Sequence, residues 1–181
     1  FILMGNHYHL IAKFPRANKS SFMKSLNGML PKLVSTHVRG FEDGKLWSRR
    51  YKDSVLARAE DVEHWFFYCA LNPVSSGLLQ DPDGYCGYNS FRDASMGRTR
   101  TYDVFDLDGY NEAIRAGRKV EKKEFIQHYE LKFESLPSVS TGSQASYQEY
   151  LEKAREKHRV AIIEEFNSSE LLLGYFKIDH C

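Results

Sequence analysis

The chain has 181 residues, 42% of them hydrophobic and 14% aromatic, which is enough for a packed core and excludes a fully disordered chain. No run of eighteen apolar residues occurs, which excludes a transmembrane helix. The three cysteines do not have the spacing of a zinc ribbon, which favours a reducing, cytoplasmic setting. The net charge is +1, but residues 1–60 hold 11 Lys and Arg against 4 Asp and Glu, whereas residues 101–181 hold 11 against 15. A polyanion would therefore bind to the first third of the chain. The alternative is that these basic residues form an ordinary solvated surface.

The first predicted element is a β-strand over residues 1–14, with a break near Gly5 and an end at Pro15. His7 and His9 lie two positions apart in this apolar run, so on a strand both imidazoles point to the same face. Two neutral imidazoles can supply two of the ligands of a divalent metal site, which then needs further ligands. Such a pair in a strand is, however, more often incidental. The sequence begins inside this strand, so we expect part of the domain to precede it.

Two helices are predicted in the first half of the chain. The first covers about residues 20–38, and Pro31 should kink or divide it. The second covers about residues 60–72 and is bounded by Pro73.

The stretch between these helices is predicted to be extended and interleaves aromatic with basic side chains. Arginine pairs with phosphate, and aromatic rings stack on unpaired bases, so this composition suits single-stranded or hairpin DNA. We interpret Trp47 as a core anchor. The residues predicted to bind DNA are Arg49, Arg50, Tyr51 and Lys52.

Tyr68 and Asn72 are four positions apart on the second predicted helix, so they lie on one face about a turn apart. A phenol can attack phosphorus, and an amide oxygen beside it can serve as a third metal ligand. Taken singly, Tyr68 is more often a core or rim aromatic and Asn72 a helix end. Together with His7 and His9 they form a nucleophile-plus-metal set on regular elements.

The second half of the chain carries weaker signals. In chain order the sequence predicts a turn-rich stretch (77–91), an acidic, partly helical stretch (102–116), an amphipathic helix (122–133), a linker (138–146), a long charged helix (147–166) and a short helix (169–176). Composition divides the chain into a first domain over 1–97, a helical extension over 98–137, a linker over 138–146 and a helical segment over 147–181.

Four segments of the first domain occur in a distinctive order, at residues 4–11, 44–51, 68–78 and 85–91. They resemble, in that order, the Met-Pro-Asn-His-x-His-Leu, Gly-x-Leu-Trp-Gln-Arg-Arg-Phe, Tyr-Ile-x-x-Asn-Pro-Val-Arg-Ala-Gly-Leu and Tyr-x-Trp-Ser-Ser motifs of the HUH single-tyrosine transposases. The resemblance is closest to the REP-associated tyrosine transposases. The chain departs from these motifs at Gly5, which replaces proline, and at Ser75 and Ser76, which replace an Arg-Ala pair and remove one candidate phosphate contact.

The resemblance implies an α+β fold with a ferredoxin-like antiparallel sheet and helices, whose first strand and helix would precede this sequence. It implies that His7 and His9 bind Mg²⁺ or Mn²⁺ and that Tyr68 is the nucleophile; Asn72 stands where related enzymes carry a polar third ligand. The implied activity is cleavage and rejoining of single-stranded DNA near hairpin repeats through a 5′-phosphotyrosine.

The implied setting is the nucleoid in the cytoplasm, with DNA as the partner, no membrane, and a homodimer as one form of assembly. The first alternative is a domesticated or decayed copy that binds repeat DNA without cutting it. The second is another kind of metalloprotein that uses the histidine pair, but this does not explain Tyr68 and Asn72.

Overall fold

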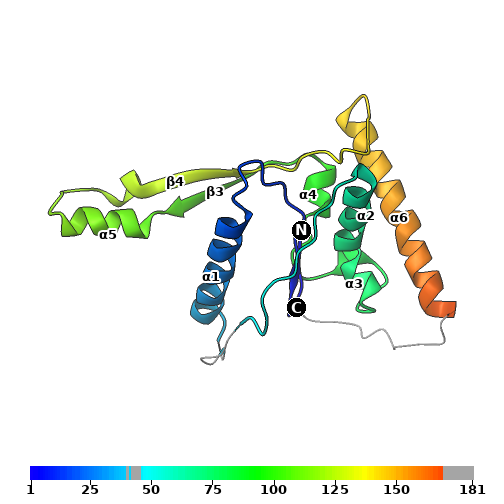
Figure 1. The fold of residues 1–181 in the computed structure, drawn as a ribbon, viewed down its shortest axis with the longest axis horizontal. Coiled ribbons are helices and arrows are strands. Elements are labelled where there is room, and N and C mark those ends of the chain that lie inside the picture. The colour runs from blue at the N-terminus through cyan, green and yellow to red at the C-terminus, as the bar shows by residue number, and fades with distance from the viewer. Residues whose placement is uncertain (40, 42–45, 169–181) are drawn as a thin grey trace. The chain divides into compact units, whose positions relative to one another are not determined.

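The computed structural model describes residues 1–39, 41 and 46–168 (Figure 1). Over these residues the fold is α+β, as predicted at that level, with two small antiparallel sheets and six α-helices. Contacts divide the chain into two compact units: residues 1–10 together with the chain from residue 58 onward, and residues 11–57. The first unit is therefore discontinuous in sequence. The domain boundaries predicted from composition stay predictions.

A β-hairpin stands at the start of the first unit, where the sequence predicted one strand over residues 1–14. Strand β1 (Ile2–Leu3) pairs antiparallel with β2 (Tyr8–His9), and Ile2 lies opposite His9. The chain reverses direction around Gly5, where the sequence predicted only a break. Glycine and asparagine at this point are typical turn residues.

A distant segment of the chain lies along the other edge of β1. The Leu3 N–H donates to the Tyr88 carbonyl at 2.9 Å, and Ile2 forms an antiparallel bridge with Asn89. Gly87 permits this approach, because a Cβ atom there would lie 2.6 Å from the Leu3 carbonyl oxygen. The hairpin is therefore held in place by residues that come some eighty positions later.

Two consecutive helices follow the return of the chain to the first unit. Helix α2 (Ala59–Ala70) begins with Glu60 and Asp61 in its first turn, where carboxylates favour the positive end of the helix dipole. The predicted helix over residues 60–72 is confirmed in its main part. Asn72 does not end it, however, but begins a second short helix, α3 (Asn72–Ser75), because Pro73 fits the first turn of a new helix better than the interior of the old one.

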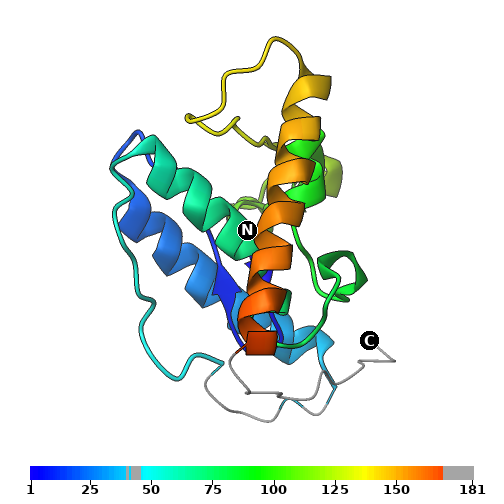
Figure 2. The same ribbon diagram turned by 90° about the vertical axis from the view of Figure 1, so that its right-hand side faces the viewer.

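The longest helix packs against α2, α3 and α4 (Phe91–Ser95), as both views show (Figures 1 and 2). This helix, α6 (Gln144–Ser168), confirms the predicted long charged helix. The hydrophobic core lies between these elements and is made of Phe67, Ala70, Phe91, Leu136, Tyr147 and Leu151. The short helix predicted at 169–176 lies outside the described residues.

The segment between α4 and α6 differs most from prediction. It contains β3 (Arg100–Phe105), α5 (Leu107–Arg115), the 3₁₀-helix η2 (Lys122–Phe125) and β4 (Ile126–Leu131). Strands β3 and β4 pair antiparallel along their whole length. The amphipathic helix predicted over 122–133 is therefore wrong, and the helical prediction for 102–116 holds only for α5.

Buried charge joins β3 to α4. Asp93 is 3% exposed and accepts hydrogen bonds from Arg100 Nε and Nη2 at 2.9 and 2.8 Å and from Tyr88 Oη at 2.5 Å. These donors hold the pKa of the Asp93 carboxyl below its usual range, with the Arg100 hydrogen bonds as the largest cause.

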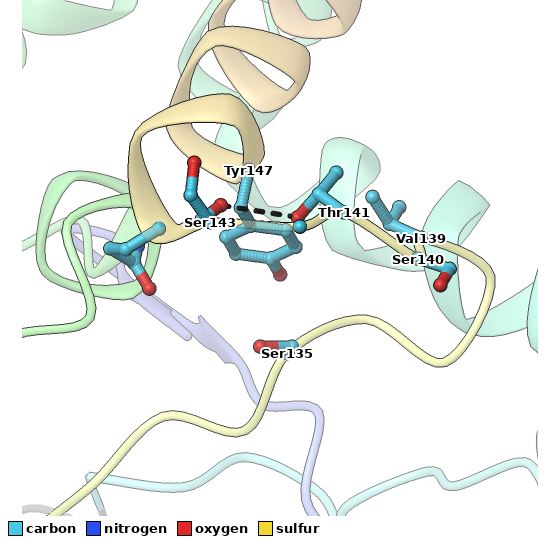
Figure 3. A pocket seen from close by; sticks show the side chains of 8 residues that line it. Ser135, Val139, Ser140, Thr141, Ser143 and Tyr147 are labelled. Atoms are coloured by element: carbon cyan, nitrogen blue, oxygen red, sulfur yellow. Dashed lines mark hydrogen bonds between the residues drawn. The ribbon is translucent and has the colours of Figure 1, made fainter.

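An open pocket of about 390 Å³ lies where the predicted linker meets α6 (Figure 3). Small and hydroxyl side chains line it, and Tyr147 forms part of its wall while its hydroxyl accepts from the Leu136 N–H at 2.9 Å. None of the candidate site residues borders this pocket.

The second unit is built around helix α1 (Lys19–His37), which is continuous although Pro31 lies inside it. Proline has no N–H to donate to the carbonyl four residues earlier, which belongs to Asn27. The indole Nε1 of Trp47 donates to that carbonyl instead, at 3.0 Å. This contact supports the interpretation of Trp47 as an anchor within its unit. Residues 46–57 contain no regular helix or strand.

No helix in the described part of the chain is both long enough and apolar enough to span a bilayer.

Candidate functional site

The hairpin brings the two predicted metal-binding imidazoles together. His9 lies in β2 and His7 just before it, so the alternation of a strand turns both to the same face. Their ring centroids are 4.9 Å apart and the ring planes are nearly perpendicular, at 87°. His7 is exposed, and its Nδ1 contacts the Asn6 side chain at 2.6 Å. This Nδ1 contact leaves Nε2 as the ring nitrogen of His7 that can face a ligand.

Tyr68 reaches the same place from helix α2. Its ring lies edge to face against His9, with centroids 5.2 Å apart at 84°. Tyr68 keeps 38% of its surface exposed, so it is not enclosed in the core. The predicted nucleophile and the predicted metal-binding pair therefore meet, although some sixty residues separate them in sequence.

Asn72 completes the set and makes a direct polar contact with it. Its side chain is only 3% exposed, and Nδ2 lies 3.1 Å from His9 Nε2. Its Oδ1 accepts a hydrogen bond from the Ser76 hydroxyl at 3.3 Å. The sequence predicted that the Asn72 oxygen would face the metal, whereas here the amide nitrogen faces His9. The two amide orientations differ by a rotation of the same planar group.

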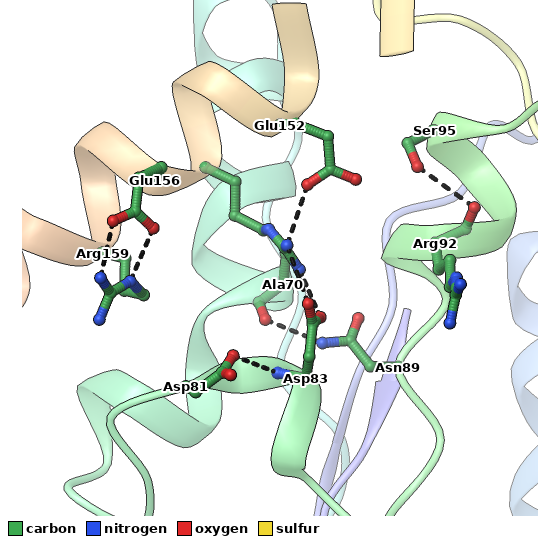
Figure 4. A network of polar contacts seen from close by, with 10 residues as sticks. Ala70, Asp81, Asp83, Asn89, Arg92, Ser95, Glu152, Glu156 and Arg159 are labelled. Atoms are coloured by element: carbon green, nitrogen blue, oxygen red, sulfur yellow. Dashed lines mark hydrogen bonds and ion pairs between the residues drawn. The ribbon is translucent and has the colours of Figure 1, made fainter. Parts of the chain in front are cut away.

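Asn89 joins the two halves of the site, and sequence reasoning missed it. Its Nδ2 donates to the Ala70 carbonyl at the end of α2 at 2.9 Å, as Figure 4 shows. Asn89 also forms the bridge to Ile2 in β1. One residue thus links the helix that carries Tyr68 to the hairpin that carries the histidines. No sequence spacing could reveal this link, because all three segments are far apart in the chain.

The environment favours the neutral imidazole at His9, which is the metal-binding form. Burial lowers the pKa of His9, and the neighbouring His7 lowers it further. Cys69 follows Tyr68 directly but does not compete as a nucleophile, because burial raises the pKa of its thiol to about 11. At neutral pH this thiol is protonated and packs as an apolar group.

The donor atoms fit a metal site that is completed from outside the protein. Among the described residues, no three His, Cys, Asp or Glu side chains gather as a metal-binding group. His7, His9 and Asn72 offer two nitrogens and, with the amide rotated, one oxygen. Such a set suits Mg²⁺ or Mn²⁺ when water and phosphate oxygens supply the remaining ligands.

The residues predicted to bind DNA belong to the second unit. Arg49, Arg50 and Lys52 are exposed, and the Arg50 guanidinium lies 5.7 Å from the centroid of the Tyr51 ring. Asp53, which follows them, forms an ion pair with Lys19 of α1. This unit therefore presents several cations and one partly exposed ring on a short irregular segment.

A second polar cluster, which includes none of the predicted site residues, holds α6 in place (Figure 4). The Arg155 guanidinium donates to Asp83 at 2.6 and 3.1 Å and pairs with Glu152 at 2.9 Å. The same guanidinium lies 4.4 Å from the centroid of Phe91, a core residue. Each of these groups has a structural partner, so the cluster supports the fold and not the chemistry.

Comparisons of the chain with models of protein families, with curated proteins and with solved structures found no match.

Proposed function

We propose that the chain is a metal-dependent single-strand DNA endonuclease and transposase of the HUH single-tyrosine kind. The observation that carries the proposal is the meeting of His7, His9, Tyr68 and Asn72 at one place in the first unit. Their residue types and order match the resemblance drawn from the motifs. A nucleophile, two imidazoles and an amide within contact distance form what phosphodiester cleavage through a protein nucleophile requires.

In the proposed reaction, Tyr68 Oη attacks a phosphorus atom of the strand. A Tyr–O–P bond forms, the P–O3′ bond breaks, and the strand leaves with a 3′-hydroxyl end. A bound Mg²⁺ or Mn²⁺ would polarise the phosphate and stabilise its developing charge. His7, His9 and Asn72 would hold that ion, and attack by an incoming 3′-hydroxyl on the phosphotyrosine would rejoin the DNA.

The proposal extends to the fold and the setting of the protein. The β1–β2 hairpin would be part of a ferredoxin-like antiparallel sheet. The substrate would be single-stranded DNA near hairpin repeats, bound partly by Arg49, Arg50, Tyr51 and Lys52. The protein would act at the nucleoid in the cytoplasm, in transposition or DNA recombination, with a homodimer as one form of assembly.

A non-catalytic role is the second candidate, and one observation favours it. The Asn72 amide nitrogen, and not its oxygen, faces His9 Nε2. If that hydrogen bond persists in the presence of metal ions, His9 is not available as a ligand. The protein would then be a domesticated or decayed copy that binds repeat DNA without cutting it.

One experiment separates these functions. The protein is incubated with labelled hairpin DNA carrying single-stranded flanks and Mn²⁺, and a covalent adduct is sought on a denaturing gel. The proposed enzyme gives an adduct that is lost in Tyr68→Phe and with a chelator. Tyr85→Phe, which removes the hydroxyl that donates to the Leu3 carbonyl, is the matched control and keeps the adduct. Binding without an adduct in the intact protein favours the non-catalytic role.

A further inference from the structure

Helix α2 presents two different faces. Phe67, Cys69 and Ala70 are buried in the first unit at 2%, 6% and 3% exposure. Trp65 and Tyr68 lie on the other face and keep 39% and 38% of their surfaces exposed. Phe67 is the residue of this helix that contributes an aromatic ring to the buried core, whereas Trp65 is not part of that core.

Trp65 adjoins the proposed nucleophile. The two residues are three positions apart, about 4.5 Å along the helix axis, and their ring centroids are 5.0 Å apart at 72°. The His64 ring is the other neighbour of Trp65, with centroids 5.7 Å apart at 84°. Together with His9 and His7, these side chains form a continuous row of rings in edge-to-face contact. The contacts limit the freedom of the indole before any ligand arrives.

We propose that Trp65 stacks on an unpaired base next to the phosphate that Tyr68 attacks, an inference that rests on the proposed function. The base beside a phosphate is the nearest flat, uncharged group of a DNA strand. A partly exposed indole about one turn from the nucleophile is placed to meet it. Base–aromatic stacking contributes strongly to single-strand binding and tolerates any sequence, because every base has a π-face.

The chemistry of the Trp65 indole favours a base over the other parts of DNA as its partner. Trp65 carries no charge, so it offers nothing to a phosphate, which Arg and Lys bind instead. A paired base keeps its faces covered by its neighbours in the duplex and cannot stack on a side chain. The contact therefore selects single-stranded DNA at the point of cleavage.

The test compares two probes of equal charge: oligothymidylate and an abasic deoxyribose-phosphate chain of the same length. Affinities are measured by anisotropy with Tyr68→Phe as the background, so that no cleavage occurs. We expect Trp65→Ala to weaken oligothymidylate binding about 5- to 150-fold, as expected for one stacked base, and to leave abasic binding unchanged. Tyr102→Ala, on a 48% exposed ring of β3, is the matched control and changes neither.

Fluorescence identifies the side chain directly. The chain has two tryptophans, so quenching by oligothymidylate that is present in the intact protein and absent in Trp65→Phe belongs to Trp65. Equal affinity of the intact protein for both probes overturns the inference, as does equal weakening of both by Trp65→Ala. If the quenching depends on the bases but hairpin DNA gives no covalent adduct, the Trp65 contact is supported and only the proposed catalytic activity is refuted. No binding of either probe overturns the Trp65 inference, whereas the proposed enzyme is tested separately by the adduct with hairpin DNA.

Discussion

The side chain of Asn72 lies between two partners that accept different orientations of its amide. Its Nδ2 faces His9 Nε2 and its Oδ1 faces the Ser76 hydroxyl. A hydroxyl can donate or accept, so Ser76 can satisfy either end of the amide. Rotation of the amide would turn the oxygen toward a metal beside His9 while Ser76 accepts from the nitrogen. Ser76 thus makes both forms of the site available without an unpaired buried group.

This arrangement predicts how substitutions at Asn72 act. Asn72→Ala should weaken Mn²⁺ binding about 10-fold or more and destabilise the fold by about 1–3 kcal/mol, because His9 loses its buried partner. Asn72→Asp should restore Mn²⁺ binding, since a carboxylate is a stronger ligand for a hard ion. Electron paramagnetic resonance of free Mn²⁺ measures the affinity, and urea denaturation measures the stability.

Ser75→Ala is the matched control for these variants. The Ser75 hydroxyl donates to the backbone carbonyl of Asn72 at 3.1 Å and does not touch its side chain. We expect its Mn²⁺ affinity to equal that of the intact protein. If Asn72→Ala weakens Mn²⁺ binding no more than Ser75→Ala does, Asn72 is not a ligand.

At the scale of elements, helix α1 shows how a helix keeps an internal proline. Pro31 has no N–H to donate to the Asn27 carbonyl, and Trp47 Nε1 donates to that carbonyl. Trp47→Phe should therefore destabilise the unit by about 0.5–1.5 kcal/mol in the presence of Pro31. In the Pro31→Ala background the cost should be smaller, because the backbone N–H that alanine restores can bond to the same carbonyl. Denaturation of the four proteins gives the coupling.

Additive effects in this double-mutant cycle would show that the indole N–H and the missing proline N–H are unrelated. Pro31→Ala alone should stabilise the helix, because proline is unfavourable by about 3 kcal/mol in a helix interior. A loss of stability on that change would mean that the ring of Pro31 makes contacts that outweigh its helix propensity.

Helices with a strong local signal were predictable from the sequence, and the second sheet was not. The predicted starts of α1 and α2 lie one residue from the observed starts, and the predicted bounds of the charged helix lie within three residues of those of α6. The stretch around β4 was wrongly predicted to be a helix, because its aromatic residues recur every four positions, at Phe125, Tyr129 and Phe133. Pairing with β3, more than twenty residues earlier, overrides that local pattern. The reversal at Gly5 was missed for a similar reason, since each strand of that hairpin has only two residues.

The four central residues of the site could be named from spacing and motif order, but their supports could not. His7, His9, Tyr68 and Asn72 have residue types that fit the chemistry and occur in segments that resemble known motifs. Ser76, Trp65 and Asn89 act through contacts that only the folded chain creates. Ser76 carried one weak signal, because it follows Asn72 by four positions in a helical segment.

At the scale of the whole molecule, charge predicts how DNA binding responds to salt. The excess of Lys and Arg lies in residues 1–60, so phosphate contacts should come mainly from there. Replacing Arg49 and Arg50 together by alanine should reduce the slope of log affinity against log salt by about 1.4 for single-stranded DNA. Anisotropy titrations over a range of salt concentrations measure this slope.

Arg118→Ala provides the control, because Arg118 is an exposed arginine of the first unit, outside the basic third of the chain. It should leave the slope unchanged. If the slope falls with Arg118→Ala and not with the Arg49 and Arg50 change, the DNA follows a different surface.

The discontinuity of the first unit has a consequence for how the protein is made. The ribosome releases the hairpin with His7 and His9 before Tyr68 and the residues that hold β1, which follow some sixty to eighty positions later. At about 5–20 residues per second, the hairpin waits several seconds without its partners. An isolated two-stranded hairpin is marginal in water, so it stays unformed over that time. Co-translational folding therefore completes the histidine half of the site only after the segment that holds β1 has emerged, although the histidines themselves are synthesised earlier.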